Sequence, residues 1–238
     1  MSGYVVSVRE LCKEYSGGFT ALDRINVDLP YGQIIGLLGP NGGGKTTFIK
    51  ILAGLLTPTS GSVEIGGYAP GVESKKIVSY LPERTYFNSW MTVKECIGFF
   101  EDFYEDFDSR AANDMLNTLG INIDAKLKTL SKGTKEKVQL VLVMSRKAQL
   151  YLLDEPIAGV DPAAREFILK TIISNYNSNA TVLISTHLIS DIEQILDSFV
   201  FINQGKIFAR GSVDSVREEK GMSLDEFFRE VFRCLPNC

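Results

Sequence analysis

The segment Gly39–Thr47, GPNGGGKTT, constrains the fold more than any other part of the chain, because it matches G-x-x-x-x-G-K-[ST]. An apolar run precedes it and a helical pattern follows it, which is the strand–loop–helix context in which this motif binds phosphate. Glycines let the backbone wrap around an anion, and the N–H groups of a helix start point at that anion. The predicted phosphate loop consists of Gly39, Pro40, Asn41, Gly42, Gly43, Gly44, Lys45, Thr46 and Thr47.

A second motif supplies carboxylates for the same chemistry. In LYLLDEP, Asp154 and Glu155 follow an apolar run and emerge at the carboxyl edge of the predicted sheet, where α/β sheets bind ligands. We expect Lys45 to reach the β- and γ-phosphates of a nucleotide, and Thr46 and Asp154 to hold Mg²⁺. Glu155 is then predicted to be the base that activates or positions the attacking water.

The distribution of apolar residues predicts an α/β fold. The runs at 34–38, 150–153 and 181–185 are apolar throughout, as strands of a parallel sheet covered on both faces must be. The earlier runs at 4–11 and 21–29 alternate, which is typical of an antiparallel pair with one exposed face. Further strands are expected at 62–65, 77–81, 199–202 and 207–209, and helices at 45–53, 92–107, 109–119, 134–145, 162–175, 188–196 and 223–234.

The chain is predicted to form one domain, 1–238, because no linker, repeat or low-complexity tract divides it. Strand signals are almost absent from about residue 84 to 146, so we expect a helical subdomain inserted there. In the last predicted helix, an apolar stripe recurs at helical spacing and must pack on another surface. Its members are Leu224, Phe227, Phe228, Val231 and Phe232.

Composition excludes several classes of protein. Of the 238 residues, 45% are hydrophobic and 23% are charged, which are ordinary values for a globular protein and unlike a disordered chain. The net charge of −4 argues against a dedicated nucleic-acid binder, which relies on neutralising phosphates. No apolar stretch approaches the ~18 residues of a membrane-spanning helix. The four cysteines are scattered and predict free thiols rather than a zinc site.

Three further motifs follow the phosphate loop in a fixed order: LSKGT at Leu130–Thr134, IAGVDP at Ile157–Pro162, and LISTH, which ends at His187. With them, the chain resembles the ATP-binding subunits of ABC transporters over essentially its full length. The resemblance implies a P-loop NTPase core with a mixed sheet, an N-terminal antiparallel β subdomain and the inserted helical subdomain. It also implies that the protein hydrolyses ATP with Mg²⁺ and powers transport through a separate transmembrane permease, as a cytoplasmic subunit held at the inner face of the membrane.

The same resemblance assigns roles to individual residues. Ser131 and Gly133 would contact the γ-phosphate of ATP held by a second ATP-binding subunit, either a second copy or a paralogue; a helix start with small residues is a suitable anion site. His187 would bond to the γ-phosphate, and Asp161 would lie at the seam between subunits. Tyr15 would stack on adenine.

The chain departs from the family pattern at two motifs. Glu83 stands where the family usually has glutamine, and a carboxylate there can still ligate Mg²⁺. Lys132 and Thr134 stand where glycine and glutamine are commonest. The segments SYLPE, LSKGTK and MSLDEFF resemble the multidrug and peptide-export branch, which implies export of a drug, an antimicrobial peptide or a lipid-like substrate. The permease is expected to dock near the aromatic residues Tyr86, Phe87, Trp90, Phe99, Phe100, Phe103 and Phe107.

Other functions remain as alternatives. An importer subunit would carry the same motifs, and so would a non-transport ATPase in DNA repair or translation. DNA-repair ATPases insert a long coiled coil between the phosphate loop and the LSKGT-like motif, whereas only 86 residues separate Lys45 from Ser131 and show no heptad run. Translation factors carry two such cassettes in tandem. A small-molecule kinase has no use for the LSKGT-like or IAGVDP motifs.

Overall fold

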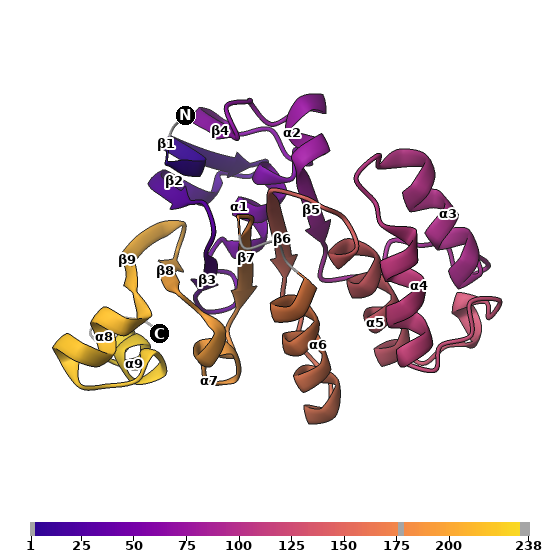
Figure 1. The fold of residues 1–238 in the computed structure, drawn as a ribbon. Coiled ribbons are helices and arrows are strands. Elements are labelled where there is room, and N and C mark those ends of the chain that lie inside the picture. The colour runs from indigo at the N-terminus through magenta and orange to yellow at the C-terminus, as the bar shows by residue number, and fades with distance from the viewer. Residues whose placement is uncertain (1–2, 176–178, 234–238) are drawn as a thin grey trace.

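The computed structural model describes residues 3–175 and 179–233. They form two sheets flanked by helices (Figure 1). The antiparallel sheet has the order β2-β1-β4 and consists of β1 (Tyr4–Tyr15), β2 (Phe19–Pro30) and β4 (Ser60–Ile65). The larger sheet has the order β5-β6-β7-β3-β8-β9 and consists of β3 (Ile34–Leu38), β5 (Val78–Leu81), β6 (Leu150–Asp154), β7 (Thr181–Thr186), β8 (Ser198–Asn203) and β9 (Lys206–Ser212).

The larger sheet is parallel except at its last strand, since β9 runs antiparallel to β8. Every residue of β3, β6 and β7 is buried, which explains why these strands are largely apolar. Their buried polar residues stand at or next to strand ends: Asp154, Thr181, Ser185 and Thr186. All of the predicted strands are present, with ends shifted by a few residues. The mixed sheet and the separate antiparallel sheet confirm the expected fold class.

The helices also follow the expectation, with additions. They are α1 (Lys45–Leu52), α2 (Val72–Ile77), α3 (Val93–Phe103), α4 (Ser109–Thr118), α5 (Lys132–Met144), α6 (Pro162–Asn175), α7 (Ile189–Ile192), α8 (Val213–Lys220) and α9 (Leu224–Arg233). The short polar helices α2 and α8 were not expected, because neither carries a long apolar stripe. The helix expected at 92–107 is shorter and ends at Phe103, since Tyr104 is extended. The helix expected at 188–196 is also shorter: α7 ends at Ile192, and a 3-10 turn, Glu193–Ile195, follows it.

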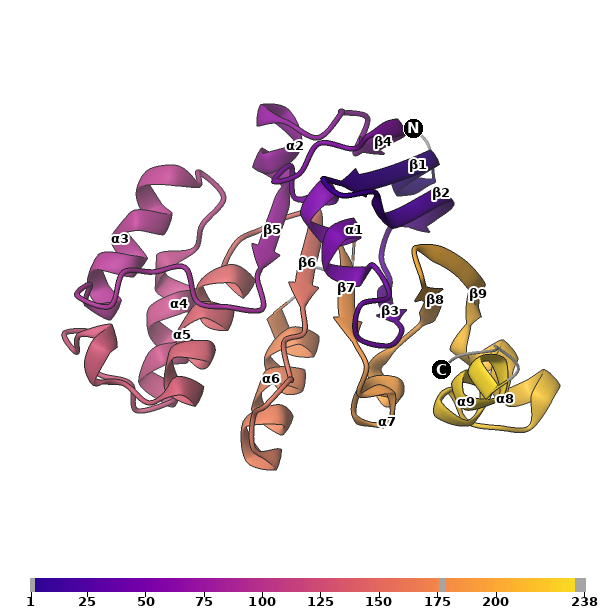
Figure 2. The ribbon, with the colours of Figure 1, turned by 180° about the vertical axis from the view of Figure 1, so that it is seen from behind.

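Helices α3, α4 and α5 lie together beside the β5 edge of the large sheet (Figure 2). One buried side chain joins them to that sheet: Arg146, which follows α5, donates to both carboxylate oxygens of Asp106 at 2.9 and 3.1 Å. It also donates to the carbonyls of Lys76 and Val78, at the start of β5. The limits of an inserted subdomain at about 84 and 146 remain a prediction.

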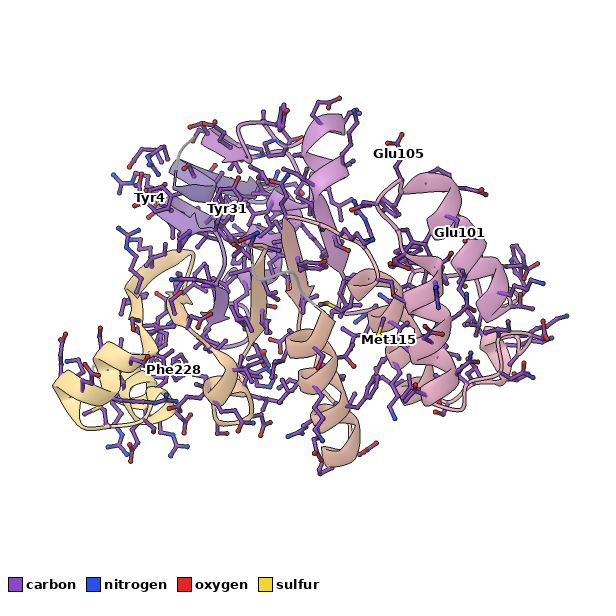
Figure 3. The ribbon with its side chains drawn as sticks, in the orientation of Figure 1. Tyr4, Tyr31, Glu101, Glu105, Met115 and Phe228 are labelled. Carbon is purple, nitrogen blue, oxygen red and sulfur yellow. The ribbon has the colours of Figure 1, made fainter. Side chains whose placement is uncertain are left out.

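The C-terminal helices cover the opposite end of the sheet (Figure 1). The expected apolar stripe of the final helix packs within the same chain, because Phe201 of β8 contacts three of its rings. Phe228, labelled in Figure 3, lies 5.1 Å from Phe201 between ring centroids. Within residues 3–175 and 179–233, no helix has the length and apolar character needed to cross a membrane.

Candidate nucleotide-binding and active site

The predicted phosphate loop connects β3 to α1 and lies at the end of the sheet toward which β3 points (Figure 2). Two of its glycines are required by close packing. A Cβ atom on Gly39 would lie 1.9 Å from the carbonyl oxygen of Ile202. Gly44 has a φ of +107°, and a Cβ there would lie 2.7 Å from the carbonyl oxygen of Ala21. The loop therefore fits tightly against β2 and β8 and leaves its outer side open.

Lys45, the first residue of α1, is buried and points under the loop. Its Nζ donates to the carbonyl oxygens of Gly39 at 2.7 Å and Pro40 at 3.1 Å. The same Nζ lies 3.3 Å from Oε1 of Glu155. A bound phosphate would have to compete with these three oxygens for the ammonium group.

Asp154 ends β6 with its side chain fully buried beside the loop. Its Oδ1 accepts hydrogen bonds from Thr46 Oγ1 at 3.1 Å and from Ser185 Oγ at 2.7 Å. Oδ2 is buried and has no hydrogen-bond partner. Burial is the main cause that raises the pKa of Asp154, and the bonds from Ser185 and Thr46 oppose that rise. A buried carboxylate oxygen without a partner, next to a threonine hydroxyl, fits the oxygen ligands that Mg²⁺ prefers.

Glu155 follows directly and has a strained backbone, with a φ of +50°. Its N–H donates to the backbone oxygen of Ser185 at 3.1 Å and to its Oγ at 3.0 Å. Its carboxylate oxygens lie 3.2 and 3.3 Å from Nδ1 of His187. The two residues predicted to be catalytic, from the ends of β6 and β7, therefore lie in contact. Ser185, which bonds the carboxylate of Asp154 and the backbone N–H of Glu155, was not predicted from the sequence.

A cavity of about 440 Å³ opens over the loop. Its lining comprises Phe19, Ala21, Asn41, Gly42, Gly43, Gly44, Lys45, Thr46, Thr47, Glu83, Glu155, Ala158 and His187. Tyr15 lies at its border, with its hydroxyl 3.3 Å from Thr47 Oγ1. The rings of Tyr15 and Phe19 are stacked at 6.5 Å, and both are exposed. Phe19 was not predicted; its position at the start of β2, opposite Tyr15, was the only available signal.

Three residues that the resemblance assigned to the seam or to the nucleotide of a second subunit do not line this cavity. In the described chain, its lining includes neither Ser131 nor Gly133 nor Asp161. Ser131 is exposed and caps α5, where its Oγ accepts from the N–H of Thr134 at 3.1 Å. Asp161 is also exposed. One chain therefore brings together the loop, the carboxylates, Glu83 and His187, and presents the remaining predicted groups on its surface.

Sequence comparison agrees with this arrangement. A family model described as ABC transporter matches residues 22–158, more than half of the chain. The chain belongs to the ABC transporter ATP-binding family. The ABC-type transporter ATP-binding protein EcsA of Bacillus subtilis is 31% identical, over 92% of this chain and 94% of EcsA. The linearmycin resistance ATP-binding protein LnrL of Bacillus subtilis is also 31% identical, over 85% of this chain and 68% of LnrL.

Solved structures of ABC proteins share the fold. An ATP-binding subunit of an ABC transporter has a TM-score of 0.86 and 29% identity, with 96% of this chain and 99% of that chain covered. An ATP-binding cassette in a dimeric post-hydrolysis state, bound to ADP and Pi, has a TM-score of 0.77 and 21% identity, with 87% and 98% covered. The expected family resemblance and fold are thereby confirmed.

Proposed function

We propose that this ABC transporter ATP-binding subunit hydrolyses ATP as one half of a two-subunit site and thereby drives export through a separate permease. The contact of Glu155 with both Lys45 and His187 supports hydrolysis most directly. It places a carboxylate between the cation of the phosphate loop and the histidine of the adjacent strand end. Such a carboxylate can accept a proton from water beside the γ-phosphate.

In the proposed mechanism, the phosphates of ATP replace Glu155 as the partner of Lys45. The freed carboxylate of Glu155 accepts a proton from water as the water oxygen bonds to the γ-phosphorus and the bond from that phosphorus to the oxygen of the leaving ADP breaks. Nδ1 of His187, 3.2 Å from the carboxylate, keeps the carboxylate oriented. Thr46, Asp154 and the exposed carboxylate of Glu83 would hold Mg²⁺, which neutralises charge on the β- and γ-phosphates when it is bound. Tyr15, together with Phe19, would stack on adenine.

The second half of the site is proposed to come from a second ATP-binding subunit. Ser131 and Gly133 stand at the N-terminus of a 13-residue helix, where backbone N–H groups and the helix dipole favour an anion. Because both lie outside the cavity of their own chain, they are available to the nucleotide of another subunit. Asp161, exposed on the loop after Glu155, would lie at the seam. The solved dimeric cassette bound to ADP and Pi is a precedent within the fold.

The permease is proposed to dock at a groove of about 620 Å³ between the large sheet and α3. Phe99, Phe103 and Tyr86 line it and are between 41% and 69% exposed, unlike the buried Phe100. Three basic residues also line the groove: Lys50 of α1, Lys75 of α2 and Arg84. Helix α3 carries the acidic residue Glu101 (Figure 3). We propose that a cytoplasmic helix of the permease, apolar in its middle and charged at its ends, occupies this groove and holds the protein at the inner face of the membrane.

Export of a drug, an antimicrobial peptide or a lipid-like molecule is the proposed direction and substrate class. Its support is the resemblance of SYLPE, LSKGTK and MSLDEFF to export subunits, together with the 31% identity to a linearmycin resistance protein.

The test is phosphate release by the purified chain at increasing protein concentration. A shared site predicts that activity rises more than linearly with protein concentration. The phosphate loop predicts that Lys45→Ala abolishes ATP binding. Ser131→Arg should still bind ATP but lose the more-than-linear rise in activity. Strictly linear activity, unchanged in Ser131→Arg, would show that one chain holds a complete site.

A further inference from the structure

One side chain ties the loop after Glu155 to the segment after His187. Arg165, in the first turn of α6, donates from Nη1 to Oδ2 of Asp191 at 2.6 Å. Its Nε donates to the carbonyl oxygen of Val160 at 3.2 Å. The guanidinium therefore links α6, the loop that precedes it, and α7.

These partners stand next to residues with proposed roles in hydrolysis. Val160 is buried and directly precedes Asp161, whose carbonyl accepts the N–H of Arg165 at 3.0 Å. Asp191 lies in α7, a single turn that starts two residues after His187. The N–H of Leu188, between them, is fixed by Thr186 Oγ1 at 3.0 Å. His187 thus has a strand end on one side and a helix anchored by Arg165 on the other.

The geometry requires arginine at this position. A guanidinium carries donors in a fixed planar fork and can serve a carboxylate and a carbonyl at once, whereas one ammonium nitrogen cannot keep both contacts in the same geometry. Other charges on α6 do not compete, because Lys170 pairs with Glu166 at 2.6 Å. Arg165 and Asp191 border an open hollow of about 670 Å³ and are each about 30% exposed, so the link is accessible to solvent on one side only.

We propose that Arg165 is a positioning residue for ATP hydrolysis: it makes the seam loop at Val160–Asp161 and the His187 segment move as one unit. Engagement of Asp161 by a second subunit would then hold His187 in its existing contact with Glu155. The inference rests on the proposed function, since it concerns the same site, but it adds a residue that does not line the nucleotide cavity.

The experiment compares Arg165→Lys, Arg165→Gln, Asp191→Asn and the double variant Arg165→Gln/Asp191→Asn, with Lys170→Gln as a matched control on the same helix. We expect kcat to fall roughly tenfold in each single variant except Arg165→Lys, which should lose less because it keeps the charge. KM and the Kd for ATP should stay within about twofold, since neither residue lines the nucleotide cavity. The double variant should be no slower than the slower single variant, because both changes break one link.

The outcomes separate the two proposals. If the wild type binds ATP without hydrolysing it, the proposed function fails. If the wild type hydrolyses ATP and the Arg165 and Asp191 variants keep its kcat, or if their losses add independently, only the positioning role is overturned. A rise in KM without a loss of kcat also overturns it. Should Arg165→Gln unfold, Asp191→Asn removes the same link from the other side and decides the question.

Discussion

Replacing Glu155 by glutamine should separate ATP binding from ATP hydrolysis. The amide keeps the size of the side chain but removes the negative charge 3.3 Å from Lys45 Nζ. It cannot take a proton from water at neutral pH. We therefore expect turnover to fall by about 10²- to 10⁴-fold, the usual contribution of a general base.

The effect on affinity follows from the buried ion pair. Two unit charges 3.3 Å apart attract by about 5 kcal/mol at an effective dielectric constant of about 20. Most of this attraction is offset by the cost of burying both groups, which leaves a net value on the order of 1 kcal/mol. ATP must displace Glu155 from Lys45 in the wild type but not in the variant. We expect Glu155→Gln to bind ATP about fivefold more tightly.

Calorimetric titration with ATP and a phosphate-release assay measure the two effects on the same preparation. Glu136→Gln is the matched control, because Glu136 lines the neighbouring cavity beside Glu155 and forms its ion pair with Lys132 instead of Lys45. Wild-type turnover in Glu155→Gln would refute the base assignment. Weaker ATP binding would refute the competition for Lys45.

Three further substitutions, one of them with a matched control, test other parts of the structure. Burial raises the pKa of Asp154, so its ionisation lowers the free energy of unfolding as pH rises from about 4 through the raised pKa. Asp154→Asn removes this charge but keeps an oxygen that accepts from the hydroxyls of Thr46 and Ser185, so it should raise Tm at pH 7 and abolish Mg²⁺-dependent turnover. A lower Tm would contradict this reasoning. Arg146→Met should lower the free energy of unfolding by about 3 kcal/mol in urea, because it breaks a buried charge link, whereas Lys147→Gln, whose exposed pair contributes little, should change it by less than about 0.5 kcal/mol. Tyr15→Ala should weaken binding of ATP but not of tripolyphosphate, and an equal loss for both would exclude adenine stacking.

The strands were predictable because burial and composition coincide in them. A strand covered on both faces is mostly apolar, and β3, β6 and β7 contain runs of that kind, with their polar residues at or next to the strand ends. The helix α8 was not predictable in the same way: it buries only Val213 and Val216, so no stripe marks it.

The site was predictable only as far as its motifs reach. The phosphate loop and the pair Asp154–Glu155 can each be identified from a few consecutive residues, and the structure brings them together. Ser185 gives no such signal, because the sequence around a serine in an apolar strand does not show whether its hydroxyl bonds to a site residue. Its importance depends on the pairing of β6 with β7, which places it opposite Asp154. Arg146 likewise acquires its role from Asp106, forty positions earlier in the chain.

In the proposed function, the position of the LSKGT motif would couple ATP hydrolysis to movement of the permease. Ser131 begins α5, and Arg146, at the other end of that helix, lines the groove proposed for the permease. A rigid 13-residue helix therefore spans from a surface that would meet the nucleotide of a second subunit to a surface that would meet the permease. If the proposed site forms, closure of the two subunits around ATP would move the groove, and reciprocally a helix docked in the groove would change the affinity for ATP. A cassette whose site was complete within one chain would hydrolyse ATP without moving α5, and no energy would reach the groove.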